Sequence, residues 1–164
     1  MADQPTVLRA MARYNRWMNE KLYAAAGSLS EAERHQDRGA FFKSIHGTLD
    51  HILLGDRLWL GRFVGRQYEV VRLGQLLFQD FAALSAARIS LDQDILDWAE
   101  GVDAAWLGQD LVYRSMVDGN EHRKPRWLLA QHMFNHQTHH RGQATTLLTQ
   151  LGLDVGPTDL PWMP

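Results

Sequence analysis

Four of the eight histidines of this 164-residue chain lie in the segment HMFNHQTHH, residues 132–140. On a helix, which turns by about 100° per residue, His136 and His140 lie one turn apart on one face. Two imidazoles so placed can direct their ring nitrogens at a single divalent ion, at about 2.0 to 2.1 Å. The same spacing also suits two buried histidines that only make hydrogen bonds. The rest of the sequence must decide between these two interpretations.

The helix that carries this pair is predicted to run from Trp127 to Gly152. Its apolar residues fall in one arc roughly 60° wide on a helical wheel, which marks the core-facing side: Leu129, Met133, Ala144, Leu147 and Leu151. His136 and His140 lie within or at the edge of this arc, so they point into the protein. His132 lies near its rim and His139 further round, so we expect these two near a bound substrate and not on the ion.

Other residues of this helix limit the chemistry. A zincin needs His-Glu-x-x-His with the Glu as base, but Gln137 stands in that place. A di-iron bundle needs Glu-x-x-His pairs, and the sequence has none. The general base would then be a water acidified by the ion, or one of the outer histidines, His132 and His139. Gln143, one turn beyond His140, could orient a histidine ring or a water.

A third ligand is available on a second predicted helix, from Phe41 to Gly65. Its apolar face comprises Phe41, Ile45, Ile52, Trp59 and Phe63. His51 lies on the flank of this face, and Gly55, one turn on, leaves room for a ligand although a helical glycine costs roughly 1 kcal/mol relative to alanine. We expect Asp56 to be a buried hydrogen-bonding anchor, in preference to a partner of a metal ligand. His46 projects the opposite way and is expected to be exposed.

Two more amphipathic helices are predicted, one from Pro5 to Ala26 and one from Leu76 to Gly101. The first carries one polar residue, Asn15, on its apolar face. A buried Asn must be satisfied by hydrogen bonds, so Asn15 either fixes helix packing or lines an internal polar site. A polar connector from Ser28 to Ala40 follows, and its His35 is expected to be solvated.

The remaining connections complete the architecture. A short extended crossover is predicted between Arg66 and Gly74. Asp118-Gly119 is a strong two-residue turn signal, so strands near Leu111 to Met116 and Glu121 to Lys124 should form a hairpin. The expected fold is all-α, a four-helix bundle with a small β-hairpin before the last helix, in a single domain over residues 1–164.

Composition excludes several classes of function. The net charge of -2 and the pI near 6.4 leave no basic face for a nucleic acid. The sequence has no cysteine, so any metal must be held by His, Asp or Glu, and a reducing compartment fits. Neither a long apolar run nor a basic leader occurs. We therefore expect a cytoplasmic protein without a membrane or nucleic-acid partner.

Three segments, RYNRWMNEKL, TLDHILLGDRLWLGRFVG and HMFNHQTHHRGQATTLLTQLG, resemble the DinB-like family, also called DinB/YfiT-like, over nearly the whole chain. The resemblance implies a divalent metal held by one histidine of the second helix and an HxxxH pair of the last. These positions are His51, His136 and His140, and the helical wheel selects the same pair independently. The resemblance also implies thiol-dependent transferase, isomerase or hydrolase chemistry among relatives, and a homodimer.

We therefore expect a metal-dependent hydrolase or thiol-dependent transferase that acts on a small molecule, with a low-molecular-weight thiol as one candidate. Three imidazoles suit zinc or nickel first, then iron or manganese, and leave coordination positions open. Because ligands must be neutral, with a reference pKa of about 6.5, metal affinity should fall as the pH drops through about 6.

Two other interpretations of the histidines are compatible with the sequence. One is a non-catalytic stress-response protein in which a structural ion ties two helices together, and the other is an apolar bundle whose histidines only make hydrogen bonds.

The apolar tail VGPTDLPWMP, residues 155–164, should cover either its own bundle or a homodimer interface.

Overall fold

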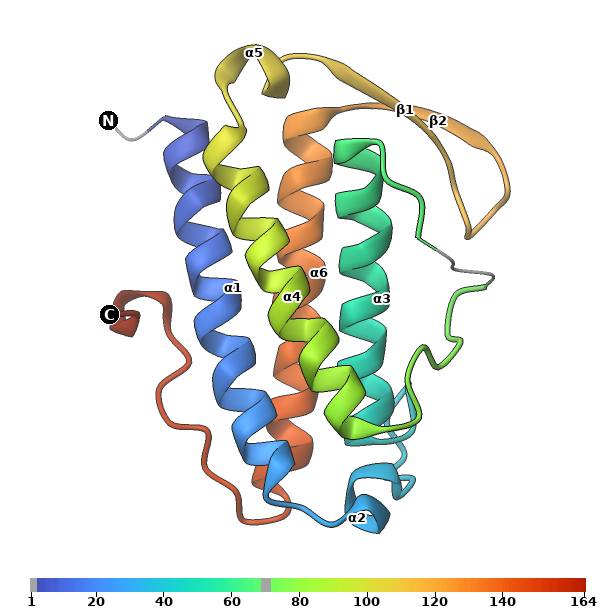
Figure 1. The fold of residues 1–164 in the computed structure, drawn as a ribbon, viewed down its shortest axis with the longest axis vertical. Helices are drawn as coiled ribbons and strands as arrows, with labels where there is room; N and C mark the ends of the chain where they lie inside the picture. Colours follow the sequence, from blue (N-terminus) through green and yellow to red (C-terminus); the bar gives the residue numbers. More distant parts are fainter. Residues whose placement is uncertain (1–2, 69–71) are drawn as a thin grey trace.

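Four long helices form the body of the structure, a computed structural model that describes residues 3–68 and 72–164 (Figure 1). They are α1 (Gln4–Gly27), α3 (Ile45–Val64), α4 (Phe81–Gly101) and α6 (Arg126–Thr149). The other described elements are α2 (Glu31–His35), α5 (Ala104–Leu107), β1 (Asp110–Arg114), β2 (Glu121–Pro125) and η1 (Leu160–Trp162). The predicted all-α class with an antiparallel hairpin before the last helix is confirmed. Every helix among the described residues is too short or too polar to cross a membrane.

The start of α3 differs from the prediction because Ser44 caps it. The Ser44 Oγ accepts a hydrogen bond from the Gly47 N–H at 3.0 Å, which satisfies a backbone donor of the first turn. Phe41 therefore lies before the helix and is 81% exposed, so its assignment to the apolar face was wrong. At the other end Gly65, with a φ of 70°, terminates α3.

The helix α4 also begins later than predicted. Asp80 caps it by accepting a backbone N–H of the first turn at 2.7 Å. The preceding residues are held by α3, because the Asp50 carboxylate accepts the N–H of Leu77 at 2.8 Å and that of Phe78 at 2.9 Å. Residues 69–71, within the predicted extended crossover, lie outside the described residues.

His46 is buried, so the expectation that it is exposed was wrong. Its Nε2 donates to the carbonyl oxygen of Phe78 at 2.7 Å, and its ring stacks on that of His35 at 4.1 Å between centroids. His35 is accordingly half-buried and not solvated. The helical wheel missed this contact because α2 and the segment before α4, which cover this side of α3, are not visible in the period of a single helix.

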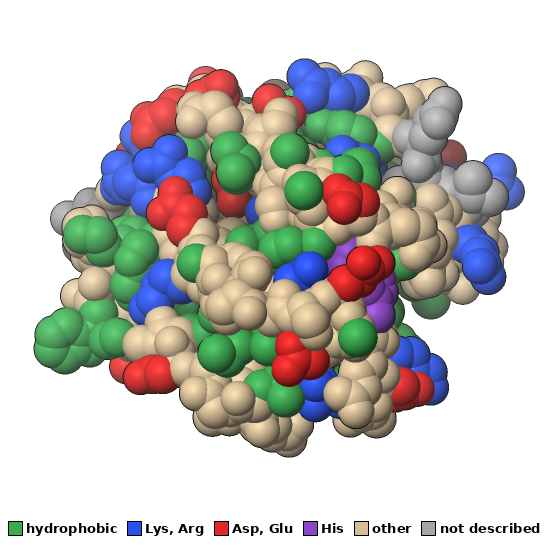
Figure 2. Space-filling view, turned by 60° about the horizontal axis from the view of Figure 1, so that its bottom comes forward, with side chains coloured by type: hydrophobic (Ala, Val, Ile, Leu, Met, Phe, Trp, Pro, Cys, Tyr) green, Lys and Arg blue, Asp and Glu red, His purple; other side chains and the backbone are tan. Residues whose placement is uncertain are grey.

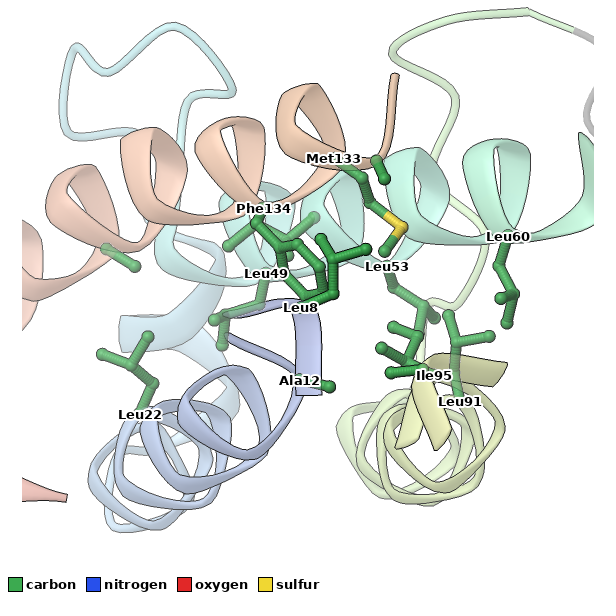
Figure 3. Packing of buried hydrophobic residues seen from close by; sticks show 14 of the residues in the cluster. Leu8, Ala12, Leu22, Leu49, Leu53, Leu60, Leu91, Ile95, Met133 and Phe134 are labelled. Carbon is green, nitrogen blue, oxygen red and sulfur yellow. The ribbon is translucent and has the colours of Figure 1, made fainter. Parts of the chain in front are cut away.

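The apolar faces of the four long helices meet in one core (Figure 3). Phe134 and Met133 of α6 face Leu49 and Leu53 of α3, and Leu8 of α1 lies beside Phe134. None of these side chains is more than 5% exposed. Truncation of such a side chain to alanine costs about 2–5 kcal/mol, so this core holds the two histidine-bearing helices, α3 and α6, together.

A second, charged interior lies beside the apolar core. Arg88 of α4 pairs with Asp56 of α3 at 2.6 Å and with Asp92 of its own helix at 2.8 Å. All three side chains are at most 3% exposed, and burial raises the pKa of Asp56. Asp56 is therefore a buried anchor, as predicted.

This charged interior extends to the other two long helices. Asn15 of α1 donates to Asp92 at 2.8 Å and accepts a hydrogen bond from Arg141 of α6 at 2.5 Å. Gln137 of α6 donates to Asp56 at 2.9 Å. Asn15 thus fixes helix packing, one of the two roles considered for it, and the buried polar network includes all four long helices.

The C-terminal tail returns along α1 (Figure 1). The Tyr14 hydroxyl donates to the carbonyl oxygen of Thr158 at 2.5 Å, and the Lys21 ammonium donates to that of Pro157. Trp162, near the end of the tail, is 69% exposed. The tail therefore covers part of its own bundle but leaves its last aromatic side chain in solvent.

The buried network makes a prediction for stability. Arg88→Met leaves the Asp56 and Asp92 carboxylates without their cation, so the free energy of unfolding should fall by about 3–5 kcal/mol. The matched control is Arg16→Met, which breaks an exposed pair with Glu20 and should cost about 0.3–0.5 kcal/mol. Urea denaturation at pH 7 measures both. Equal losses in the two variants would contradict the assigned role of the network.

Candidate metal centre

The structure brings His51, His136 and His140 together where α3 packs against α6. One ligand nitrogen from each lies within 4.8 Å of the others, and the Nε2 atoms of His51 and His136 are 3.2 Å apart. Two nitrogens bound to a tetrahedral ion at 2.0–2.1 Å are separated by about 3.3 Å. The spacing of this pair therefore fits a single divalent ion.

Gly55 is the reason that His136 can reach His51. A Cβ atom at Gly55 would lie 2.7 Å from Cε1 of His136, closer than side chains tolerate, and 3.0 Å from its Nδ1. Gly55 also lines the cavity described below, as the expected room for a ligand implies, and the ring of His136 packs against its Cα. The glycine is a cradle for a ligand side chain, which itself supports the fit of the three histidines to an ion.

Gln143 orients the third histidine. The Nδ1–H of His140 donates to Oε1 of Gln143 at 2.8 Å, which leaves the Nε2 lone pair of His140 free for an ion. The Nε2 of Gln143 lies 3.4 Å from Nε2 of His139, which is exposed on the outer side of α6. Gln143 thus connects an outer histidine to the centre.

Burial keeps the three rings neutral. It lowers the pKa of His136 to about 3 and that of His51 to about 4, and it also lowers the pKa of His140. Neutral imidazole is the form that binds metal. Protons should therefore compete with the ion for these rings only at a pH below the value near 6 expected from sequence.

Phe42 covers part of the centre, and no sequence pattern indicated this position. Its ring stacks on His51 at 3.7 Å and meets the edge of His140 at 5.3 Å, measured between centroids. The next residue, Lys43, has a φ of 69°, a left-handed conformation that is uncommon for a side chain of this kind. Phe42 was expected within a helix, whereas this sharp turn places it over the histidines.

A cavity of about 350 Å³ opens on the other part of the centre. Its lining includes His51 and His136 but neither His140 nor Phe42. The lining also includes Leu54, Gly55, Leu58, Trp59 and Arg62 of α3, Leu73 before α4, His132 of α6, and Tyr113, Ser115, Met116 and Val117 of the hairpin segment. His132 packs edge-on against Trp59 at 5.0 Å between centroids. Of the two outer histidines, only His132 lines this cavity.

The close contact between Gly55 and His136 predicts how a substitution of this glycine changes metal binding. Gly55→Ala should push the His136 ring off its position and weaken zinc binding by about tenfold or more, the scale seen when a ligand loses its orienting contacts. Gly142→Ala on α6 is the matched control, because its Cβ would meet no heavy atom within 4 Å. Calorimetric titration with Zn²⁺ compares the two. Wild-type affinity in Gly55→Ala would contradict the proposed cradle.

The lowered pKa values make a prediction for metal-free protein. Since His51 and His136 titrate near pH 4 and 3 when folded and near 6.5 when unfolded, the unfolded state binds more protons between these values. Stability is therefore complete above about pH 6.5 and falls as the pH drops towards 4. Urea midpoints from pH 7 to 4.5 should decline less steeply in a His51→Gln, His136→Gln variant. Parallel curves would show that burial of these rings does not shift their titration.

Comparisons with known proteins agree with this architecture. The model of the DinB family matches residues 1–164. The curated Protein DinB of Bacillus subtilis (strain 168) is 26% identical over 152 residues, which covers 89% of this chain and 87% of that protein. The crystal structure of a DinB-like protein from Bacillus cereus ATCC 10987 superposes with a TM-score of 0.62 at 16% identity, covering 87% of this chain and 91% of the other. The chain belongs to the DinB family.

Proposed function

We propose that this protein is a divalent-metal-dependent enzyme, a hydrolase or a thiol-dependent transferase that acts on a small molecule. The observation that carries the proposal is the convergence of His51, His136 and His140 beside a cavity that exposes two of them. An all-nitrogen set of three neutral ligands suits zinc or nickel, with iron or manganese next. A three-ligand site leaves room for a further ligand from solvent or substrate.

The bound ion would act as a Lewis acid, polarising a substrate atom or making a water or thiol more acidic. The protein would supply orientation and proton transfer around it. Gln143 holds the Nδ1–H of His140, which leaves the Nε2 lone pair of that ring for the ion. Apolar side chains of the cavity, among them Trp59 and Met116, would exclude bulk water from the substrate.

His132 is the residue best placed to exchange a proton with a substrate. It lines the cavity beside His136, with 6.0 Å between the ring centroids. Burial and the charge of Arg62 lower its pKa, so its imidazole is neutral at pH 7 and can accept a proton. His139 lies outside the cavity, and we assign it a supporting role through its contact with Gln143.

The second candidate is a non-catalytic stress-response protein with a structural ion that joins α3 to α6. Two observations favour the enzyme. The helices are already joined without an ion, through the core and through the hydrogen bond from Gln137 to Asp56. A structural site is also expected to be closed by protein, whereas His51 and His136 line an open cavity.

We further propose a cytoplasmic homodimer without a nucleic-acid partner. The absence of cysteine is compatible with a reducing compartment. Figure 2 shows acidic and basic side chains interspersed on the visible face, without the single-sign patch that nucleic acids require. The exposed Trp162 of the tail is a candidate contact between the two copies.

Substitution of single histidines tests the ligand set. Protein purified without a nickel column should contain one divalent ion per chain by elemental analysis, and His51→Ala, His136→Ala or His140→Ala should each lose it. The matched controls His132→Ala and His139→Ala should retain it, because neither ring joins the group of converging nitrogens. Once a substrate is available, His132→Ala should lower the rate by about 10²–10⁴, as for a lost acid or base.

Two outcomes would overturn parts of this proposal. Full metal content in His136→Ala removes the site. Metal loss in His132→Ala with retention in His140→Ala would exchange the ligand pair, since His132 and His136 are also one helical turn apart.

A further inference from the structure

Among the described residues, the lining of the cavity beside the metal centre includes a cationic side chain but no anionic one. Arg62 lines it together with His51, His132 and His136, and no aspartate or glutamate among residues 3–68 and 72–164 does. An ion bound by the histidines would add further positive charge. Within the described part of the chain, this leaves the interior of the cavity positive in a protein whose net charge is -2.

Arg62 is held in a fixed position by contacts that do not neutralise it. Its guanidinium lies over the ring of Trp59 at 4.5 Å and over that of Tyr113 at 4.7 Å. One Nη donates to the carbonyl oxygen of Arg114 at 3.0 Å. In the described residues no carboxylate lies within 4.0 Å of it, so several of its N–H groups have no acidic partner.

The setting of Arg62 contrasts with that of Arg88. Arg88 is balanced by two carboxylates, as a buried charge normally must be. Arg62 is half-buried, and burial lowers its pKa. Burial of an arginine without an acid costs free energy, and an anion that enters the cavity would recover that cost.

We propose that this cavity binds a small molecule with a carboxylate group, which Arg62 holds while a second functional group of the same molecule faces the histidines. The planar guanidinium matches a carboxylate through two parallel hydrogen bonds. Trp59 and Tyr113, which clamp the guanidinium, would pack on the organic part of the molecule. This inference rests on the proposed function, because it names the substrate class of the same site.

A chain of contacts joins the anion site to the centre. The ring centroids of His136 and His132 are 6.0 Å apart, and those of His132 and Trp59 are 5.0 Å apart. The guanidinium of Arg62 lies over the ring of Trp59. His132 thus lies between the two ends of a bound molecule. It is placed to exchange a proton with the atoms that react while the carboxylate stays fixed.

Thiols with and without a carboxylate test the proposal. Protein loaded with Co²⁺ is titrated with mercaptoacetate, 3-mercaptopropionate and 4-mercaptobutyrate, and with neutral 2-mercaptoethanol, while the thiolate-to-cobalt absorption is recorded. The best-fitting mercaptocarboxylate should bind about tenfold more tightly than 2-mercaptoethanol, the value of one charge-assisted contact. Arg62→Gln should abolish this preference and leave 2-mercaptoethanol binding unchanged, and Arg62→Lys should retain part of it.

The matched control is Arg66→Gln, which removes a nearby exposed arginine that is already paired with Asp94 at 2.9 Å. It should keep the full preference for the carboxylate. Equal binding of all four thiols by wild-type protein overturns the proposal, and so does a preference that survives in Arg62→Gln. If Arg62→Gln does not fold, the wild-type preference and its reduction in Arg62→Lys decide the question.

A second measurement needs no metal and separates the two proposals. Succinate is titrated into metal-free protein labelled with ¹⁵N-arginine, and the side-chain N–H signal of Arg62 should shift in a saturable way, whereas 1,4-butanediol should leave it unchanged. Absence of a shift with succinate overturns the anion site. Failure of the protein to bind cobalt, or of every thiol to produce the absorption, would instead refute the proposed function, and the succinate titration would then decide the anion site alone.

Discussion

The arrangement of the site depends on one buried contact, the hydrogen bond from Gln137 of α6 to Asp56 of α3. In each helix the bonded residue directly follows the one that builds the centre, since Gly55 precedes Asp56 and His136 precedes Gln137. A slip of one helical turn, about 5.4 Å, would break this bond and move His136 away from its cradle. Asp56 also balances the charge of Arg88, so a slip would leave buried charge poorly compensated. The register of the ligand-bearing helices is thus set by a polar network and does not require an ion.

Two electrostatic environments lie close together as a result. The network around Arg88 holds full charges that neutralise one another, whereas the centre holds imidazoles that burial keeps neutral. The Nε2 atoms of His51 and His136 face each other at 3.2 Å, where both cannot carry a hydrogen. At least one lone pair therefore points into the centre, and a divalent cation is the partner that would satisfy both rings. A site prepared in this way needs little rearrangement to accept one.

Periodicity and motif spacing identified the four helices and the three converging histidines, because both depend on the direction in which a side chain leaves its own helix. Neither signal predicts which other residues pack against that side chain. His46 is buried by a short helix and a loop, and Phe42 lies over the histidines because Ser44 starts α3 later than the apolar pattern suggested. The sequence indicated free space beside Gly55. That the ring of His136 packs there depends on how α3 and α6 pair, which the sequence pattern does not show. Arg62 was not singled out, since a surface arginine and a cavity arginine look alike in sequence.

The hairpin formed by β1 and β2 contributes to the cavity but not to the described polar contacts that join the four long helices. Its segment supplies Tyr113, Ser115, Met116 and Val117 to the wall of the cavity, yet the described polar network and the histidine group contain none of its residues. Changes in the turn that carries Ser115, Met116 and Val117 would therefore alter the shape of the cavity and leave the hydrogen bonds between the four long helices in place. Residues that set the shape of the cavity can therefore change separately from those that hold the four helices together. Exchange of the hairpin alone is a route by which evolution, or a designer, could give the same metal centre a new substrate.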